Sequence, residues 1–388
     1  MTYDSYFLVF ARYQMLLIGL WPATISNEFL RVFYKCYSFF VQFYFTFFLM
    51  TFTLGMFTVY GSRSEKENSD SMAFLLSYYL SVLKYYLIKR EVIRKIMGKV
   101  VEFEASTKHD QQLQPIYKKE AKRNFQLGSI VPSFCMSAFL LFFLMNIKVY
   151  FIWRKMELQG LESGKILPFP WFPFYYAKYF DYYFFYQVSN AFWGGIYIMS
   201  TDALIGSLIM FSASSLKLLG VELGRFGKND NSSLENINLL RNLILKHQNI
   251  IENVEQLNKN FGLIFLLEFT IKSFHISQIL FTMLAELKIT NETIFDFMKF
   301  VIVLAQGVLT YYQANRVIAE SEKLGEKIYR CNWTEQPTLV TRSLIIMMIR
   351  TTRVLKVECH GVVILSNQLT LKVLQAIYTY LIFRISKS

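Results

Sequence analysis

The sequence predicts an all-α membrane protein with seven transmembrane helices, a cytoplasmic N-terminus and an extracellular C-terminus. Three observations predict this: an apolar and aromatic composition, seven apolar stretches of membrane-spanning length, and an uneven distribution of Lys and Arg between alternate loops. Hydrophobic residues form 54% of the 388 residues and charged residues 18%, whereas soluble domains contain about 25% charged residues. The 38 Phe and 25 Tyr residues would leave large apolar patches on a water-facing surface. Lipid is the solvent that suits this composition.

The apolar stretches set the number of spans and indicate a single domain, residues 1–388. A bilayer core about 30 Å thick is crossed by about 20 residues of helix. The stretches are longer than strands and lack the alternation of a membrane barrel, so they predict helices. The stretch from Ser129 to Ile147 contains no charged residue and is the clearest case. The seven predicted spans are 33–59, 72–88, 129–147, 183–214, 261–285, 294–312 and 361–383.

The positions of Lys and Arg predict the orientation. Seven crossings place the N-terminal stretch and the connections 89–128, 215–260 and 313–360 on one side, and these segments hold 26 of the 41 Lys and Arg residues. The segments on the other side hold 10. Basic loops stay in the cytoplasm, so the N-terminus is predicted to lie inside. The net charge of +13 therefore reflects orientation; binding to nucleic acid would leave the apolar stretches unexplained.

The three long cytoplasmic connections are predicted to be helical. Their apolar residues recur at helical spacing, as Val92, Ile96 and Val100 do within 89–128. We expect 89–128 to continue the second helix, and all three connections to form helical extensions that make a subunit-packing region. Separate amphipathic helices on lipid headgroups are the alternative. Residues 5–20 are apolar but too short to span and predict a re-entrant or interfacial helix.

The outer connection 148–182 carries a Pro-Phe-Pro-Trp-Phe-Pro run at 168–173. This run is stiff and unsuited to a helix interior, because proline removes a backbone donor. Two interpretations remain open. The aromatic residues form a belt at the membrane interface, or they form a lid over a pocket that opens to the outside.

No motif in the sequence predicts an enzyme. A phosphate-binding loop, an HExxH site, paired CxxC motifs and a G-x-S-x-G turn are absent from the sequence. The four histidines and four cysteines are scattered, so no metal site, disulfide framework or cofactor is predicted. His275 alone among the histidines lies in a predicted span, where a packing role is the simpler interpretation.

Charged residues inside the predicted spans carry more information, because each one is costly at the membrane centre unless it is paired or hydrated. Lys35, Lys84 and Lys299 lie near span ends, and we expect their side chains to reach the interface. Glu268 and Lys272 are four residues apart and can pair on one helix face. The charged residues placed deeper are Asp202, Glu268, Lys272 and Lys372.

Polar residues form a stripe along the last predicted span. Gln368, Lys372, Gln375, Thr379 and Ser386 recur at intervals of four, three, four and seven residues, which places them on one helix face. A polar stripe along a transmembrane helix needs water or polar partners over its length. It therefore indicates a helix that lines an aqueous pore or packs against a polar neighbour. Lysine is unusual in a cation pathway, an objection that a mixed oligomer reduces.

Four motifs, in order along the chain, match those of one receptor family. They are Arg12 with Leu-Leu-Ile-Gly-Leu-Trp-Pro at 16–22, the run at 168–173, Tyr-Arg-Cys-Asn-Trp at 329–333, and Arg350, Gly361 and Ala-Ile-Tyr-Thr-Tyr at 376–380. By these motifs the sequence resembles the insect odorant receptors. The connection 215–260 is shorter than that of the family's shared co-receptor, so the resemblance is to the ligand-selective (tuning) subunits.

The resemblance implies an odorant-gated, non-selective cation channel in the plasma membrane of olfactory sensory neurons. It implies a heterotetramer with insect odorant co-receptor subunits, opened by a small volatile odorant and embedded in membrane lipid. The seventh helix would line the central pore. Carried over by motif position, the pore residues are Gln375, Thr379, Ile382, Phe383 and Ser386. The polar stripe agrees with this assignment, and Phe383 suits a hydrophobic gate.

The resemblance also implies that the odorant binds within the outer halves of the second, third, fourth and sixth helices. Aromatic walls with one or two polar groups suit a small apolar ligand. Trp193 is the preferred anchor, because Gly194 and Gly195 leave space beside a large ring. The candidate ligand-binding residues are Tyr78, Tyr79, Phe142, Met145, Asn146, Tyr150, Tyr186, Trp193 and Phe300.

Other classes remain as alternatives. A seven-helix G-protein-coupled receptor would place its N-terminus outside, and the sequence lacks Asp-Arg-Tyr after the third span and Asn-Pro-x-x-Tyr in the seventh. A gustatory-type ligand-gated channel would end in Thr-Tyr followed five residues later by Gln-Phe, whereas Ser386 and Lys387 follow Thr379-Tyr380 here. A secondary transporter would show two related halves, and an integral-membrane enzyme ranks last.

Overall fold

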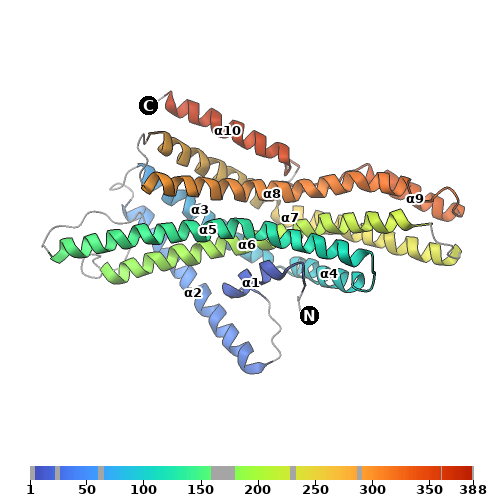
Figure 1. Cartoon of the computed structure of the whole chain (residues 1–388), viewed down its shortest axis with the longest axis horizontal. Helices are drawn as coiled ribbons and strands as arrows, with labels where there is room; N and C mark the ends of the chain where they lie inside the picture. The colour runs from blue at the N-terminus through green and yellow to red at the C-terminus, as the bar shows by residue number, and fades with distance from the viewer. Residues whose placement is uncertain are drawn as a thin grey trace.

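Four helices of 39 to 53 residues run side by side along the length of the molecule, and shorter helices pack around them (Figure 1). They are α5 (Leu113–Leu158), α6 (Phe180–Arg225), α7 (Ser233–Ala285) and α8 (Asn291–Tyr329). The computed structural model describes residues 5–21, 27–59, 65–158, 180–227, 233–285, 291–359 and 361–386. The predicted Pro/aromatic run at 168–173 lies outside these residues.

Each of the four long helices has an apolar half and a charged half, and these halves define two portions of the molecule. Their apolar halves join α2 (Glu28–Val59), α3 (Glu65–Ile88) and α10 (Asn367–Ile385) in what we call the membrane portion. Their charged halves join α4 (Glu91–Thr107) and α9 (Thr338–Thr351) in what we call the extension, at the right of Figure 1. The distal end is the end of the membrane portion where α5 ends and α6 begins.

Six helices in the described parts of the chain are long and apolar enough to cross a membrane: α2, α3, α5, α6, α7 and α8. The first six predicted spans fall in these helices. α10 lies at the position of the seventh, and its 19 residues extend about 28 Å at about 1.5 Å per residue. Gln368 and Lys372 interrupt the apolar sequence in the first half of α10.

The seventh helix begins later than the sequence predicts. An antiparallel hairpin of β1 (Glu358–Cys359) and β2 (Val363–Ile364) precedes α10, so a helical start at residue 361 is wrong. Gly361 has a φ of 73°, in the left-handed region that glycine enters without steric cost. The short apolar run after Gly361 belongs to the hairpin, and periodicity alone does not separate such a run from helix.

The connection between α3 and α5 is not the continuous helix that the sequence predicts. Arg90 has an extended backbone (φ −60°, ψ 143°), and α4 begins after it. A second break precedes α5, where Asp110 Oδ1 accepts hydrogen bonds from the backbone N–H groups of Gln112 (2.8 Å) and Leu113 (2.9 Å). A carboxylate there satisfies donors that have no partner within the helix. The breaks let α4 turn and pack against α5 and α6.

α6 lies at the centre of the bundle. It contacts α1 (Val9–Leu17), α2, α3, α4, α5, α7 and α8. A helix that is hydrophobic on all sides must be covered by other elements, and the second half of α6 fits this rule. Its fully buried side chains include Leu204, Leu208, Ile209, Ala213, Leu216 and Leu218. One continuous hydrophobic core therefore joins the membrane portion to the extension.

The N-terminal segment is docked on the bundle and does not lie alone at an interface. Phe7 is buried, its ring lies 5.8 Å from that of Phe211, and its carbonyl accepts a hydrogen bond from Asn124 Nδ2 (2.9 Å). Glu104 Oε2 on α4 accepts hydrogen bonds from Ser5 Oγ (2.6 Å) and from the backbone N–H of Tyr6 (2.8 Å). These contacts hold α1 against α5 and α6.

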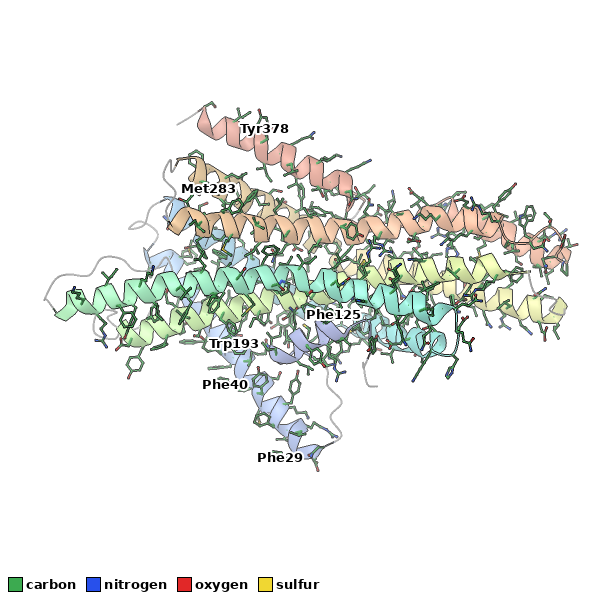
Figure 2. All side chains as sticks on the ribbon, in the orientation of Figure 1. Phe29, Phe40, Phe125, Trp193, Met283 and Tyr378 are labelled. Atoms are coloured by element: carbon green, nitrogen blue, oxygen red, sulfur yellow. The ribbon has the colours of Figure 1, made fainter. Side chains whose placement is uncertain are left out.

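α2 lies at the edge of the bundle and exposes aromatic side chains. Phe29, Phe40 and Phe57 are exposed, Phe57 to 83%. Figure 2 shows Phe29 and Phe40 on the part of α2 that extends away from the other helices. Such side chains suit contact with lipid, whose interface favours aromatic rings.

Candidate functional site

α10 packs against α7 and α8 through a narrow apolar stripe. Leu369, Val373 and Ile377 lie four residues apart on one helix face and are buried. The opposite face is exposed in the single chain, and α10 lies at the edge of the bundle in Figure 1. α10 therefore offers one free face to its surroundings.

The predicted pore residues lie on this side of α10. Gln375, Thr379, Ile382, Phe383 and Ser386 are all exposed, Phe383 to 54%. Thr379 Oγ1 donates a hydrogen bond to the carbonyl of Gln375 (2.9 Å) and Ser386 Oγ to that of Phe383 (2.8 Å). These bonds satisfy the two hydroxyl donors within the helix. The side-chain amide of Gln375 makes no hydrogen bond to the described residues, so it needs water or another chain.

Lys372 belongs to the same free face. It is exposed and forms no ion pair with the residues that the structure describes. An ammonium group at this depth of a membrane requires water or a carboxylate. Within the described chain, the partner of the polar stripe is therefore missing.

Tyr78 on α3 is the centre of a buried aromatic cluster. Its ring lies 6.0, 5.4 and 6.1 Å from the rings of Phe45, Phe48 and Phe52 on α2. On α6, a Cβ atom at Gly194 would lie 2.6 Å from the Tyr78 phenol oxygen. Because glycine has no side chain, position 194 leaves the space in which the Tyr78 ring packs against α6.

The sequence predicts space beside Trp193 at both Gly194 and Gly195, but the structure shows it at one of them. Tyr78 takes the space at Gly194, whereas a Cβ at Gly195 would meet nothing within 4 Å. The Trp193 ring lies 5.6 Å from that of Phe192 and is partly exposed. Of the two glycines, only Gly195 therefore has open space next to its backbone.

Two of the predicted ligand-binding residues, Phe142 on α5 and Phe300 on α8, pack against aromatic rings of α8. The ring of Phe142 lies 5.5 Å from that of Phe295 and is buried. The ring of Phe300 lies 6.4 Å from that of Phe297 and packs against the main core. Phe142 therefore helps to join the two helices.

A second, smaller apolar cluster lies at the distal end. Phe184 on α6 is buried there against Ile147, Tyr150 and Val188. The rings of Tyr150 and Phe184 are 5.0 Å apart, and the Tyr150 hydroxyl donates a hydrogen bond to Asp181 Oδ1 (2.8 Å). Tyr150 thus joins the end of α5 to the start of α6.

Two of the predicted ligand-binding tyrosines form hydrogen bonds with threonines of α2. Tyr79 shares a hydrogen bond with Thr53 (2.8 Å), and Tyr186 shares one with Thr51 (2.7 Å). Tyr186 and Tyr78 therefore meet neighbouring residues of α2, whereas the Tyr79 side chain is exposed to 45%. These hydroxyl pairs fix α2 against α3 and α6.

The structure brings only some of the nine predicted residues together. Tyr78 and Tyr186 both contact residues 48–52 of α2. Trp193 lies two turns after Tyr186 on α6. The rings of Phe142, Tyr150 and Phe300 contact other aromatic side chains. The side chains of Met145 and Asn146 lie outside the described residues.

Two residues of this region were missed by the sequence analysis. Gln187 and Asn190 on α6 are buried, and the side-chain amide atoms of both lack a hydrogen bond. Their spacing of three residues in an otherwise apolar helix was a readable signal of a shared face. They lie on the same face as Gly194, which is two turns further along α6 than Gln187.

A group of paired charges joins α3, α6 and α7 in the membrane portion. Lys84 Nζ on α3 lies 2.5 Å from Asp202 Oδ1 on α6 and 3.0 Å from Glu268 Oε2 on α7. Lys272 pairs with Glu268, which confirms the predicted pair at spacing four. The Lys84 side chain is 4% exposed, so the expectation that it reaches the interface is wrong. Its partners on two other helices could not be read from local spacing.

A second charged group lies between α3, α7 and α8. Lys299 Nζ lies 2.8 Å from Asp70 Oδ2 and 2.7 Å from Asp296 Oδ1, and its side chain is 10% exposed. The expectation that Lys299 reaches the interface is therefore also wrong. His275 is buried nearby, with its ring 5.3 Å from that of Phe74 and its Nε2 without a hydrogen bond.

The extension has a charged centre at Glu120 on α5. Lys217 on α6 lies 2.6 Å from Glu120 Oε1, and Arg316 on α8 lies 2.8 Å from Oε2. Burial favours the protonated acid, but these two hydrogen-bonded cations outweigh it and hold the pKa of Glu120 below its usual value. Glu120 thus ties α5, α6 and α8 together. No cluster in the described parts of the chain has the His, Cys, Asp or Glu residues to hold a metal ion.

Comparisons with known proteins agree with this architecture. A family profile described as "7tm Odorant receptor" matches residues 65–378. The structure is similar to that of the insect olfactory receptor OR5 from Machilis hrabei in complex with eugenol, with a TM-score of 0.81 and 14% sequence identity over 97% of each chain. It is also similar to a second structure of the insect olfactory receptor OR5 from Machilis hrabei, with a TM-score of 0.75 and 14% sequence identity over 97% of each chain. No curated protein matches the sequence.

Proposed function

The chain belongs to the 7tm odorant receptor family, and on this premise we propose that it is a ligand-selective subunit of an odorant-gated, non-selective cation channel. In this proposal α10 lines a central pore, shared with insect odorant co-receptor subunits in a heterotetramer of the plasma membrane. The odorant binds in the distal half of the membrane portion, which faces the outside of the cell. The observation that carries the proposal is the free polar face of α10.

The polar face supports a pore because its own chain does not satisfy it. Leu369, Val373 and Ile377 attach α10 to the bundle, and the amide of Gln375 and the ammonium of Lys372 point elsewhere. Polar groups within a membrane require water or polar partners. Four subunits with this face toward a common axis would enclose such water. The side chains of the co-receptor would supply most of the lining and dilute the positive charge of Lys372.

Phe383 is the proposed gate. Its exposed ring lies near the distal end of α10, between the polar residues Thr379 and Ser386. A ring of apolar side chains closes a narrow pore to ions because water leaves it. Ligand binding opens the pore when the ligand binds the open arrangement more tightly than the closed one.

The aromatic cluster around Tyr78 supports a distal odorant site. Apolar and aromatic walls with few polar groups suit a small volatile molecule. Tyr78, Tyr186 and Trp193 lie in this part of the bundle, together with the unoccupied space at Gly195. The structure of OR5 in complex with eugenol has this overall fold, which supports a small volatile ligand for the present chain.

The extension supports assembly with other subunits. Leu339, Ile346 and Ile349 on α9 are each exposed to more than 60%. They lie in the charged half of the molecule, where an apolar surface favours contact with protein. We therefore assign α9 to the subunit-packing region of the heterotetramer.

The test is whole-cell current in cells that express the chain with and without an insect co-receptor subunit, during exposure to a panel of volatiles. Cells with G-protein signalling blocked distinguish a channel from a G-protein-coupled receptor. We expect rapid cation currents that require both the chain and the co-receptor and persist under the block. Currents lost under the block, or silence from chains shown to be at the cell surface, would contradict the proposal.

A further inference from the structure

Gln187 has an unusual environment for a polar side chain in the membrane portion. It is 1% exposed, and neither Oε1 nor Nε2 has a hydrogen bond. Asn190, one turn further along α6, is 2% exposed, and its amide atoms also lack hydrogen bonds, although the Tyr186 hydroxyl is close by. A buried amide without a partner is costly, because it has lost its bonds to water and gained none.

The polar neighbours of Gln187 have partners within the protein. The hydroxyl of Ser189, two residues after Gln187, lies 2.9 Å from the backbone carbonyl of Tyr186 and donates to it. Tyr44 and Ser189 share a hydrogen bond of 2.6 Å between α2 and α6. The hydroxyl groups beside Gln187 are thus satisfied. Among the described residues of the distal part of α6, the amides of Gln187 and Asn190 are the buried groups that lack a hydrogen bond.

Gln187 also lies where the hydrophobic packing changes. On its distal side, Phe184 and Tyr150 belong to the small apolar cluster. On the other side, Tyr78 and Tyr197 belong to the main core. No described residue joins the two clusters into one. The two amides therefore lie on the inward face of α6, between two apolar walls.

We propose that Gln187, assisted by Asn190, is the hydrogen-bonding part of the odorant site, and that the odorant is a small volatile molecule with a carbonyl or hydroxyl oxygen. This inference rests on the proposed function and specifies the ligand class of that site. The apolar body of the ligand contacts the aromatic walls on both sides. Its oxygen completes the hydrogen bonding of the Gln187 amide.

An amide suits these two ligand groups because it has both a donor and an acceptor. Nε2 donates to a carbonyl oxygen, and Oε1 accepts from a hydroxyl. A hydrocarbon of the same shape leaves the amide unpaired, and a site built around a hydrogen bond discriminates strongly against such an analogue. The site is therefore expected to prefer oxygenated volatiles to matched hydrocarbons.

The experiment measures co-receptor-dependent currents for paired volatiles. Each pair is a primary alcohol or methyl ketone of six to ten carbons and an alkane with the same number of heavy atoms. We expect the wild-type chain to respond to the oxygenated member at lower concentration. Gln187→Met keeps the length of the side chain but removes the amide. It should raise the half-maximal concentration of the oxygenated agonist about tenfold, the effect of one lost hydrogen bond, and leave or improve the alkane response.

Two further variants make the outcome specific. Phe185→Leu changes an exposed residue on the same turn of α6 and should alter neither response. Asn190→Leu gives a second removal of an amide if Gln187→Met does not reach the cell surface. An equal change in both members of a pair, or a wild-type preference for the alkane, would overturn the inference. Absence of any current across the panel, with the chain at the surface, would instead contradict the proposed function.

Discussion

The ring of Tyr78 occupies the space that a side chain at position 194 would need. A Cβ atom at Gly194 would lie 2.6 Å from the Tyr78 phenol oxygen, while a Cβ at the next residue, Gly195, would meet nothing within 4 Å. Two adjacent glycines on one helix thus have different roles. Gly194 permits close packing of α3 on α6, and Gly195 does not limit packing.

Gly194→Ala is therefore expected to destabilise the protein by about 1–3 kcal/mol, the usual cost of overpacking. The Tyr78 ring would have to move away from α6 and disturb its contacts with Phe48 and Phe52. The measurement is the thermal unfolding midpoint of detergent-solubilised protein. Gly195→Ala is the matched control and should keep the wild-type midpoint or raise it slightly, because alanine favours helix. Equal midpoints for the two variants would refute the role assigned to Gly194.

Lys84→Met is expected to destabilise the membrane portion strongly. The substitution leaves Asp202 without its ammonium partner at 2.5 Å and Glu268 with Lys272 alone. Breaking a buried ion pair from one side costs about 3–5 kcal/mol, because the remaining charge stays buried. The readout is the amount of folded protein at the cell surface and its unfolding midpoint.

A second substitution tests whether charge is the cause. Adding Asp202→Asn to Lys84→Met restores the charge balance and should recover part of the lost stability, which a double-mutant cycle measures. Lys372→Met, on the exposed face of α10, serves as the control and should leave the midpoint unchanged. Additive losses in the double variant would argue that packing, not charge, explains the effect of Lys84→Met.

Phe383→Ala is expected to raise the current that flows without odorant. A smaller side chain widens the apolar constriction and lets water remain in it, so the closed state conducts. The measurement is the co-receptor-dependent basal current at a matched surface level. Leu371→Ala removes an exposed apolar side chain outside the polar stripe and should leave the basal current low. A tightly closed baseline in Phe383→Ala channels would exclude a gate at this residue.

The free energy of unfolding is expected to depend on pH because of His247, a buried residue of the extension. Burial, with a smaller contribution from the nearby charge of Arg350, lowers the pKa of His247 from 6.5 to about 4. The unfolded chain therefore binds a proton between pH 6.5 and 4 that the folded chain does not, so stability falls as the pH is lowered through this window. The loss contributed by this residue is at most about 3 kcal/mol.

The pH effect is measured from unfolding midpoints between the two pKa values. His247→Gln should weaken the dependence on pH, because glutamine does not titrate. His109→Gln is the control, since His109 is exposed, and it should retain the wild-type dependence. An unchanged slope in the His247→Gln protein would assign the effect to other groups.

The sequence predicted those features that depend on residues close together in the chain. The apolar stretches located the long helices, and the spacing of Glu268 and Lys272 correctly predicted their ion pair. The polar stripe on α10 follows from helical periodicity alone. Each of these features depends on residues within a few turns of one helix, so it can be predicted without knowing which other helices pack against it.

Features that depend on distant residues were not predictable in this way. The partners of Lys84 come from α6 and α7, so its distance from the span end suggested the wrong environment. The break at Arg90 depends on how α4 packs, not on a proline or glycine. The role of Gly194 depends on a ring from α3. The spacing of Gln187 and Asn190 indicates a shared helix face, but only the structure shows that both amides are buried without hydrogen bonds.

The central position of α6 has a consequence for how such receptors diversify. A helix covered on all sides has few positions that can change without disturbing a neighbour, and core substitutions of altered volume are costly. α2 and α3 keep exposed sides, so their sequences can drift more freely. Sequence change between related chains is therefore expected to concentrate on these outer helices and on the partly exposed distal turns of α6, and to be slowest in the buried second half of α6.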